Sequence, residues 1–479
     1  MYREVLAVDL PTIVRVAGAE NLEIRAARQR VEAARGRLES TVGGVFPAIV
    51  PTALFEHVEG AVRATPGDLV GVGFNSFQVA GVLQWAINPG KVVYDIVAAK
   101  KRLVATEHQE RAVVLETTRR ASTQFYELVR LQARVSAAGE AVSEAEELLR
   151  ISELRITTGT GVLADKLRAE ARLAATRQDL ILALKSLYDA SIDLALTLRL
   201  DASVTLVPGM DSVAPVTLVR DDLPPEDLLA IAVQHRPDLE SARTVVAALA
   251  ADRGATWWGS FGPQFQAGYQ IGGITGHSSN TAEPEGIPGN LLLNPFSANG
   301  SFSSNAFANG AIKEIISRGV KRLEGPSDET FGFKGQQRGT AAVGWRFSLS
   351  AFGDLKTAQA LEQLAVIAAE AQLDLAQAQV VASQQASRAN FELIGLARQQ
   401  IRSAEEALRL TQANLSAGAM TTLDVLQSQD ALAHARVRLA DAVVRYNQSQ
   451  LNLLAALGLL QDSPSSRTQS ERAQAGRES

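Results

Sequence analysis

The sequence predicts a mixed α/β membrane protein with an internal duplication, in which four membrane-length β-strands join long antiparallel coiled-coil helical hairpins. Three observations support this fold class. A segment at Ala145 recurs at Ala404, apolar residues recur every seven positions further on, and four other stretches alternate between apolar and polar residues. These patterns indicate a duplicated chain, coiled coils and strands with two unlike faces.

Composition excludes several classes of protein. The chain has 479 residues, of which 46% are hydrophobic and 21% charged, and a formal net charge of −5. The mildly acidic balance argues against nucleic-acid binding, and the lack of cysteine excludes disulfides and thiolate metal sites. No run of about 18 apolar residues occurs, which argues against a transmembrane helix.

The duplication organises the chain. Between Ala145 and Leu194, fourteen of fifty positions are identical at an offset of 259, including Gly159/Gly418 and Asp165/Asp424. Chance similarity of two Ala/Leu/Arg-rich helices is the alternative, but glycine and aspartate are not generic helix residues. We expect a first repeat over 1–200, an inter-repeat linker over 201–225, a second repeat over 226–460 and a disordered tail over 461–479.

Each repeat has the same predicted order of a first helix, two strands, a very long helix and a last helix. The expected helices span 12–40, 91–156 and 163–199 in the first repeat, and 225–256, 354–414 and 422–460 in the second. Leucines recur every seven residues from Leu173, and the series from Leu432 matches it with Tyr446 at one place; small residues follow three positions later. This repeat predicts coiled-coil packing, and for the helices alone an ordinary coiled-coil stalk fits equally well.

Four stretches with a period of two predict the strands. They lie over 47–58, 77–88, from Gln264 and from Thr340, and the first alternates poorly. Such strands fit either a soluble sandwich or a membrane barrel, whose apolar residues face lipid and whose polar residues face a watery lumen. In a barrel we expect the following residues to face the lumen: Gln78, Gln84, Gln264, Gln266, Gln270 and Arg346.

The four tryptophans lie at the ends of the strand regions that adjoin the helices. They are Trp85, Trp257, Trp258 and Trp345. In a barrel all four would form an aromatic girdle at the membrane–water interface, and in a soluble protein they would lie at the neck of a domain. The connections over 59–76 and 273–339 would be loops, with a short amphipathic helix near Ala311. Four strands cannot close a barrel, so their edges must pair with other copies, whose number the sequence leaves open.

These features carry a resemblance. The chain is similar to the TolC-like outer-membrane efflux proteins over roughly residues 12–460. RPDLESA from Arg236 resembles the opening of the second half in that family, and NLEIRAA from Asn21 is a weaker version. RITTGTGVLADKL from Arg155 and NLSAGAMTTLDVL from Asn414 resemble its hairpin ends.

The resemblance implies a homotrimer with a twelve-stranded barrel in the cell outer membrane, contacting its lipid, and a helical α-barrel in the periplasm. It implies a passive conduit for cargo from an inner-membrane pump through a periplasmic adaptor. It also implies a leader upstream of Met1, because the first residues lack a signal-peptide pattern. The alternative is a soluble or periplasmic coiled-coil scaffold or adaptor.

The hairpin ends are the candidate channel entrance. Gly159 and Gly418 suit a turn, and Asp165 and Asp424 fall in the first turn of the next helix. Helix capping alone explains the aspartates, while capping combined with an acidic ring at the entrance is the functional hypothesis. We expect no enzyme activity, no cofactor and no metal, because the five histidines are scattered without the spacing of metal ligands.

Overall fold

The computed structural model describes residues 5–63, 69–159, 162–201, 203–209, 214–220, 223–280, 314–316, 328–345, 348–417 and 419–460. The chain forms two compact units. The helical unit comprises Met1–Ala33, Val104–Thr244 and Val366–Ser479, and the sheet unit comprises Ala34–Leu103 and Val245–Ala365. Each unit therefore takes segments from both halves of the chain.

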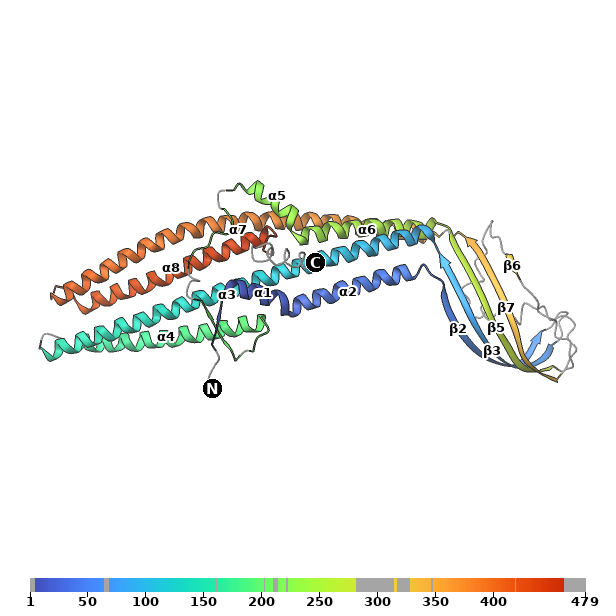
Figure 1. Cartoon of the computed structure of the whole chain (residues 1–479), viewed down its shortest axis with the longest axis horizontal. Helices are drawn as coiled ribbons and strands as arrows, with labels where there is room; N and C mark the ends of the chain where they lie inside the picture. Colours follow the sequence, from blue (N-terminus) through green and yellow to red (C-terminus); the bar gives the residue numbers. More distant parts are fainter. Residues whose placement is uncertain are drawn as a thin grey trace, which may run out of the picture. The chain divides into compact units, whose positions relative to one another are not determined.

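The long helices match the sequence prediction closely. The first pair is α3 (Pro89–Thr157) and α4 (Leu163–Thr197), and the second is α7 (Ser350–Ser416) and α8 (Thr422–Ala456). Within the helical unit α4 lies beside α3, and α8 lies beside α7 (Figure 1). The seven-residue seam is confirmed, since Leu173, Leu187 and Leu194 of α4 are buried. The same holds for Leu432, Tyr446 and Leu453 of α8.

The first helix of each repeat is broken, where the sequence predicted one continuous helix. Residues 12–40 contain α1 (Leu10–Glu20) and α2 (Leu22–Gly43), separated at Asn21. Residues 225–256 contain α5 (Pro225–His235) and α6 (Pro237–Phe261), separated at Arg236. Pro237 explains the second break, because the residue before a proline is driven out of the helical region. At the first break the Asn21 side chain accepts a 2.8 Å hydrogen bond from the Glu23 amide, as an N-cap does.

The residue at each break donates a hydrogen bond to the C-terminal end of the last helix of the same repeat. The Asn21 amide donates to the Thr197 carbonyl at 3.2 Å, and the Arg236 guanidinium donates to the Ala456 carbonyl at 3.3 Å. Thr197 and Ala456 are 259 positions apart, the offset of the duplication. The two repeats therefore share this joint, built from different donors.

Helices α4 and α8 also end in the same way. Arg199 and Gly458, again 259 positions apart, adopt the left-handed conformation with φ of 61° and 78°. The Leu200 amide then bonds the Ala195 carbonyl at 2.9 Å, and the Leu459 amide bonds the Leu454 carbonyl at 3.1 Å. This pattern is a Schellman motif, in which glycine is the usual left-handed residue.

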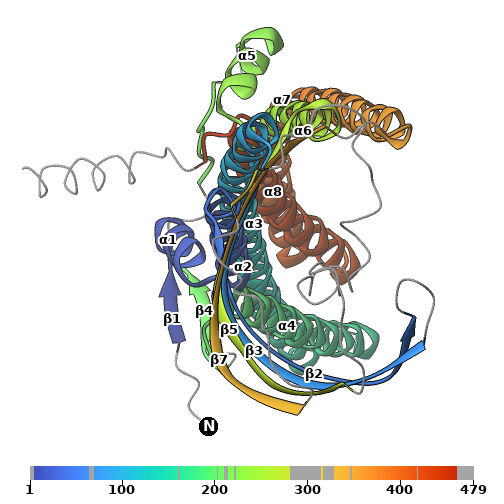
Figure 2. The same cartoon turned by 90° about the vertical axis from the view of Figure 1, so that its right-hand side faces the viewer.

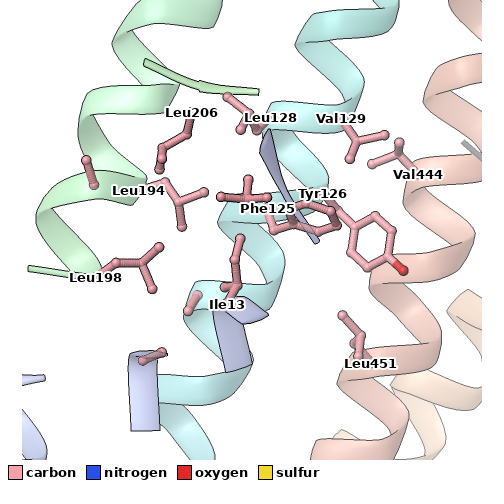
Figure 3. Close-up of a cluster of buried hydrophobic side chains, with 14 of the residues drawn as sticks. Ile13, Phe125, Tyr126, Leu128, Val129, Leu194, Leu198, Leu206, Val444 and Leu451 are labelled. Atoms are coloured by element: carbon pink, nitrogen blue, oxygen red, sulfur yellow. The ribbon is translucent and has the colours of Figure 1, made fainter. Parts of the chain in front are cut away.

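The main apolar core of the helical unit joins both repeats. Phe125 and Leu128 of α3 meet Leu194 of α4, Ile13 of α1 and Leu451 of α8 (Figure 3). Further along, α3 and α8 are joined by ion pairs, with the Arg436 guanidinium 2.7 Å from the Glu140 carboxylate and 3.1 Å from that of Glu144. Apolar packing and charge pairing together fix the second repeat against the first.

The described parts of the linker predicted over 201–225 are held by backbone pairing and by side chains of α8. Strand β4 (Thr205–Pro208) pairs in parallel with β1 (Val5–Val8). The amides of Leu218 and Val219 donate to the Gln450 side chain at 2.9 and 2.8 Å. The sequence suggested an extended segment from its prolines, but it did not reveal that polar residues of α8 would bind the backbone of this segment.

The sheet unit contains a strongly curved antiparallel sheet (Figure 2). Its strands are β2 (Ala48–Arg63), β3 (Leu69–Ile87), β5 (Gln264–Asn280), β6 (Glu314–Ile316) and β7 (Asp328–Gly344). Their order is β2-β3-β5-β7-β6. Four strands are long, as predicted, and β6 adds a short fifth strand that the sequence analysis missed.

Several predicted boundaries in the sheet were wrong. The fourth strand was placed from Thr340 onward, but β7 ends at Gly344 and begins at Asp328. The connections are shorter than 59–76 and 273–339, because β2, β3, β5 and β7 all extend beyond the alternating apolar stretches. Of the short helix expected near Ala311 only residues 314–316 are described, and they form a strand paired with Gly339–Ala341.

One helix among the described residues qualifies as a membrane span by length and composition. Ser350–Leu415 in α7 contains an 18-residue window of mean hydropathy 1.2, of which 11% is buried. A single such helix is weak evidence for a membrane span. It does show that α7 carries an apolar surface that its own chain leaves uncovered.

Candidate functional site

The two faces of the sheet differ in chemistry. The register pairs Phe55 with Phe77 and Leu83 with Tyr269, so odd-numbered residues of β2, β3 and β5 share one face. Large apolar residues on this face are exposed: Ile49 is 77% exposed, Phe55 66% and Ile271 52%. Contiguous apolar surface of this kind is rare on soluble proteins and typical of a lipid-facing strand.

The opposite face carries the glutamines singled out from the sequence. The register pairs Gln84 with Gly268 and Gln78 with Ile274, which places both on the even-numbered face with Gln264, Gln266 and Gln270. Gln270 in turn pairs with Arg338 of β7. Arg338 was missed because it lies where the sequence showed no alternation. Arg346, the predicted arginine, lies outside the described residues.

Three of the four tryptophans are exposed beside the helical ends of the strands. Trp85 is 37% exposed, and Trp257 and Trp345 are each 47% exposed. The indole N–H of Trp85 donates to the Val45 carbonyl at 2.7 Å. Two residues that the sequence analysis omitted extend this aromatic zone: Phe352, which is 64% exposed, and Phe46, which is 70% exposed.

Trp258 differs from the other tryptophans because it packs between helices. A Cβ on Gly90 would lie 2.0 Å from the Trp258 ring, so the missing side chain makes room for the indole. One turn away the arrangement is reversed, since a Cβ on Gly254 would lie 2.6 Å from the Tyr94 ring. At two places where α3 and α6 meet, an aromatic ring of one helix therefore packs on a glycine of the other. We therefore assign Trp258 to helix packing.

Asn88 connects this packing to the start of α3. Its side-chain oxygen accepts from the Lys91 amide at 3.0 Å, and its amide donates to the Trp258 carbonyl at 2.7 Å. Asn88 is 8% exposed. One buried side chain therefore caps α3 and binds α6 where both helices meet the sheet.

The end of the second hairpin has a complete capping box. The Asp424 amide donates to the Thr421 hydroxyl at 3.4 Å, and the Thr421 amide donates to the Asp424 carboxylate at 2.8 Å. The Thr421 hydroxyl also donates to this carboxylate at 2.7 Å. These hydrogen bonds, the side-chain one first, hold the pKa of Asp424 below its ordinary value. Gly418 lies outside the described residues.

The end of the first hairpin lacks that box. Val162 occupies the position of Thr421 and offers no side-chain cap to α4. Asp165 instead lies 3.3 Å from the Arg168 guanidinium, one turn along the helix. Gly159 has a φ of 73°, which agrees with its predicted place in the turn. Both aspartates fall in a first helical turn, as expected.

The described geometry is a curved sheet with one exposed apolar face, whose strands lead in the chain to long helical hairpins. Residues 13–198 match the family described as outer membrane efflux protein. Among solved structures, a membrane protein from Pseudomonas aeruginosa has a TM-score of 0.71 at 19% identity, covering 94% of this chain and 91% of that one.

Two further structures have the same fold. The outer membrane protein VceC from Vibrio cholerae has a TM-score of 0.68 at 20% identity and covers 94% of this chain and 96% of its own. The CmeC outer membrane channel of Campylobacter jejuni has a TM-score of 0.67 at 16% identity, with 96% and 88% covered. No curated protein matches the chain by sequence. Residues 13–198 thus resemble outer membrane efflux proteins in sequence, and nearly the whole chain shares the fold of these solved structures.

Proposed function

We propose that this chain is the outer-membrane channel component of a tripartite efflux or export system. It would act as a passive conduit that receives cargo from an inner-membrane pump through a periplasmic adaptor. The observation that carries the proposal is the sheet with one exposed apolar face and one polar face, joined directly to helical hairpins. The family match supports the same function.

Unpaired strand edges support assembly into a closed barrel. Within the described residues β2 pairs with β3 alone, and β6 covers three residues of β7. An open sheet edge is not tolerated in lipid, so both edges must pair with neighbouring copies. Four long strands in each chain give twelve in a trimer, within the range of known outer-membrane barrels.

Exposed apolar residues on the hairpins support the same assembly. On α4, Ile181 is 67% exposed and Leu163 is 64% exposed. On α7, Leu364, Ile367 and Leu396 are 62%, 61% and 63% exposed. These side chains would be covered when hairpins of neighbouring copies pack around a periplasmic tunnel. In that tunnel, three copies each of Asp165 and Asp424 would form the acidic entrance.

The barrel assignment gives the remaining residues their roles. Gln78, Gln84, Gln264, Gln266 and Gln270 would line the lumen with Arg338. Trp85, Trp257 and Trp345 would form the aromatic girdle on the periplasmic side, together with Phe46 and Phe352. The polar face would then line a water-filled lumen. The girdle would fix the depth of the sheet in the bilayer.

Membrane fractionation tests the proposal. We expect the protein in the detergent-extracted outer membrane, as a trimer that heating dissociates on a gel, and we expect stable pores in planar bilayers. Recovery as a soluble monomer without pore activity would overturn the proposal and favour the coiled-coil scaffold or adaptor.

A further inference from the structure

The helices that adjoin the sheet form a row that ends at α2 and at α7. The long strands follow the order β2-β3-β5-β7, and in the chain α2, α3, α6 and α7 adjoin these strands in that order. Within the sheet unit Asp252 of α6 pairs with Arg102 of α3. Arg253, also of α6, pairs with Glu362 of α7 at 2.8 Å. Helices α2 and α7 are therefore the end helices of the row, and each has an outer side that turns away from it.

Glycines show that these two outer sides are open. At the joint of α3 and α6, a Cβ on Gly90 or on Gly254 would clash with an aromatic ring of the other helix, at 2.0 and 2.6 Å. By contrast, a Cβ on Gly36 or Gly43 of α2, or on Gly353 of α7, would meet no neighbouring atom within 4 Å. A neighbouring helix thus covers the glycines of the inner joint, and no described part of the chain covers those of the outer sides.

The outer side of α7 carries a lysine. Ala351 is 3% exposed and lies on the side that contacts α6, because Glu362, eleven residues later, is almost in line with it around the helix. Lys356 follows Ala351 by five residues and Ala360 follows it by nine, which places them about 140° and 180° away around the helix. Leu364, which is 62% exposed, lies on the same side. The outer side of α7 thus combines small and apolar residues with a cation.

The outer side of α2 carries a glutamate in the equivalent place. Ala34 is 8% exposed and marks the packed side of this helix. Glu39 follows it by five residues and Gly43 by nine, the same spacings that Lys356 and the small residue after it have on α7. The two helices run in opposite directions, since α2 enters the sheet and α7 leaves it. Equal rotations from the packed sides therefore bring Glu39 and Lys356 to the same side of a joint between the two helices.

The two charges also lie level with each other. At the joint of α3 and α6, Arg102 lies 15 residues after the end of β3, and its partner Asp252 lies 12 residues before the start of β5. Lys356 lies 12 residues after the end of β7, and Glu39 lies nine residues before the start of β2. The difference is three residues in both cases. Both side chains are exposed, and neither belongs to an ion pair in the described chain.

We propose that the outer side of α7 packs on the outer side of α2 in the next copy of this chain, with an ion pair between Lys356 and Glu39 of that copy. The proposal rests on the closed barrel proposed above, in which β7 meets β2 of the next copy and so brings α7 beside its α2. Opposite charges across such a joint fix its register and the choice of partner. The joint would repeat between copies what α3 and α6 do within one chain.

Cross-linking between cysteines tests the joint, because the chain has none of its own. The test variant carries Glu39→Cys and Lys356→Cys, and its outer-membrane vesicles are treated with a short bifunctional maleimide before denaturing gel electrophoresis. The control carries Arg37→Cys and Gln359→Cys on the same two helices. These residues follow the buried alanines by three and by eight positions, which turns them to opposite sides of the joint.

We expect covalent dimers and trimers from the test pair, and monomers from the control pair and from each single-cysteine variant. A heat-sensitive trimer that conducts in planar bilayers but is not cross-linked through the test pair would overturn this joint and leave the proposed function standing. A soluble monomer without pores would overturn both.

Charge reversal tests the ion pair itself. Glu39→Lys and Lys356→Glu should each lower the temperature at which the trimer dissociates on a gel, because each places like charges across the joint. The variant that combines both reversals should regain the dissociation temperature of the wild type. A combined variant as weak as the single ones would overturn the ion pair.

Discussion

The two repeats build the same joints from different residues. At the end of the last helix the first repeat uses Arg199 in the left-handed conformation, and the second uses Gly458. At the hairpin end, Val162 leaves α4 without a side-chain cap, whereas Thr421 forms a capping box on α8. The second repeat therefore has the residue with the lower conformational strain or the better cap at both places.

This difference shows which property of the duplicated unit the fold requires. The backbone geometry of the helix ends is the same in both repeats, while the side chains that stabilise it have diverged. Packing of the long hairpins therefore fixes the geometry, and the caps adjust its stability. Substitutions that exchange residues between the repeats measure how much each cap contributes.

The largest effect is expected at the helix break of the second repeat. Arg236 is 7% exposed and its guanidinium lies 2.7 Å from the Asp238 carboxylate. Arg236→Ala leaves that carboxylate without its cation and should lower the free energy of unfolding by about 3–5 kcal/mol. The matching substitution Asn21→Ala should cost about 1 kcal/mol. Denaturant unfolding followed by circular dichroism measures both, and equal losses would contradict the account.

The stability of the same joint should depend on pH through the carboxyl group of Asp238. Burial alone would raise its pKa, but hydrogen bonds and charge from Arg236, with help from Gln372, lower the pKa below its ordinary value of 3.8. The stabilisation is therefore present at neutral pH and is lost as the pH falls through the lowered pKa. In Arg236→Ala, burial would raise the pKa of Asp238, so acid should destabilise this variant at a higher pH than the wild type.

A smaller effect is expected at the end of α8. A Cβ on Gly458 would lie 2.6 Å from the His235 carbonyl oxygen, in a residue with a φ of 78°. Gly458→Ala should cost on the order of 2–4 kcal/mol, because strain and a backbone clash add. Gly159→Ala is the control: its φ is 73° but nothing lies within 4 Å of the added Cβ. A control as damaging as Gly458→Ala would show that the clash contributes nothing.

Variants at the end of the second hairpin distinguish a capping role of Asp424 from a role at the channel entrance. Thr421→Val gives the second repeat the residue of the first and removes the cap while the acid stays. Asp424→Ala removes the acid and the half of the capping box that its carboxylate supplies, while the Thr421 hydroxyl can still accept from the backbone amide of residue 424. If the aspartate helps to form the entrance, Asp424→Ala should raise conductance in planar bilayers and Thr421→Val should not. The same conductance change in both variants would reduce Asp424 to a capping residue.

The smallest expected effect is an increase in stability. Arg199→Gly places in the first repeat the residue that the second repeat has at the equivalent position. It should stabilise the protein by about 0.5–1 kcal/mol, because glycine adopts a positive φ without strain. A modest rise in the midpoint of thermal unfolding is the expected result. A fall would show that the Arg199 side chain makes a contact worth more than the strain.

The regular parts of the fold could be predicted from the sequence. The long helices follow from a seven-residue repeat that persists over several turns, and the hairpin ends follow from glycine and a capping pair. The four long strands follow from their alternation. The alternation did not reveal the first part of β7, which is rich in glycine and charged residues, or β6, which has only three residues.

The candidate site was predicted in part for the same reason. The glutamines of β3 and β5 could be assigned to one face from their spacing. Trp258 was grouped with the girdle because its position in the sequence is the same as that of Trp257, and its packing on Gly90 depends on a partner helix far away in sequence. The pairing of Arg338 with Gln270 joins residues far apart in the sequence, and so do the hydrogen bonds that the Gln450 side chain accepts from the linker. No local pattern reveals either of them.

The central claim is that the odd-numbered face of the sheet meets lipid and the even-numbered face lines a water-filled channel. The chain has no cysteine, so single cysteines can report on each face without a background. In the reconstituted protein, Gln84→Cys should react with a water-soluble maleimide and Leu83→Cys should not, although the two residues are adjacent in β3. Equal labelling of both positions would contradict the barrel assignment.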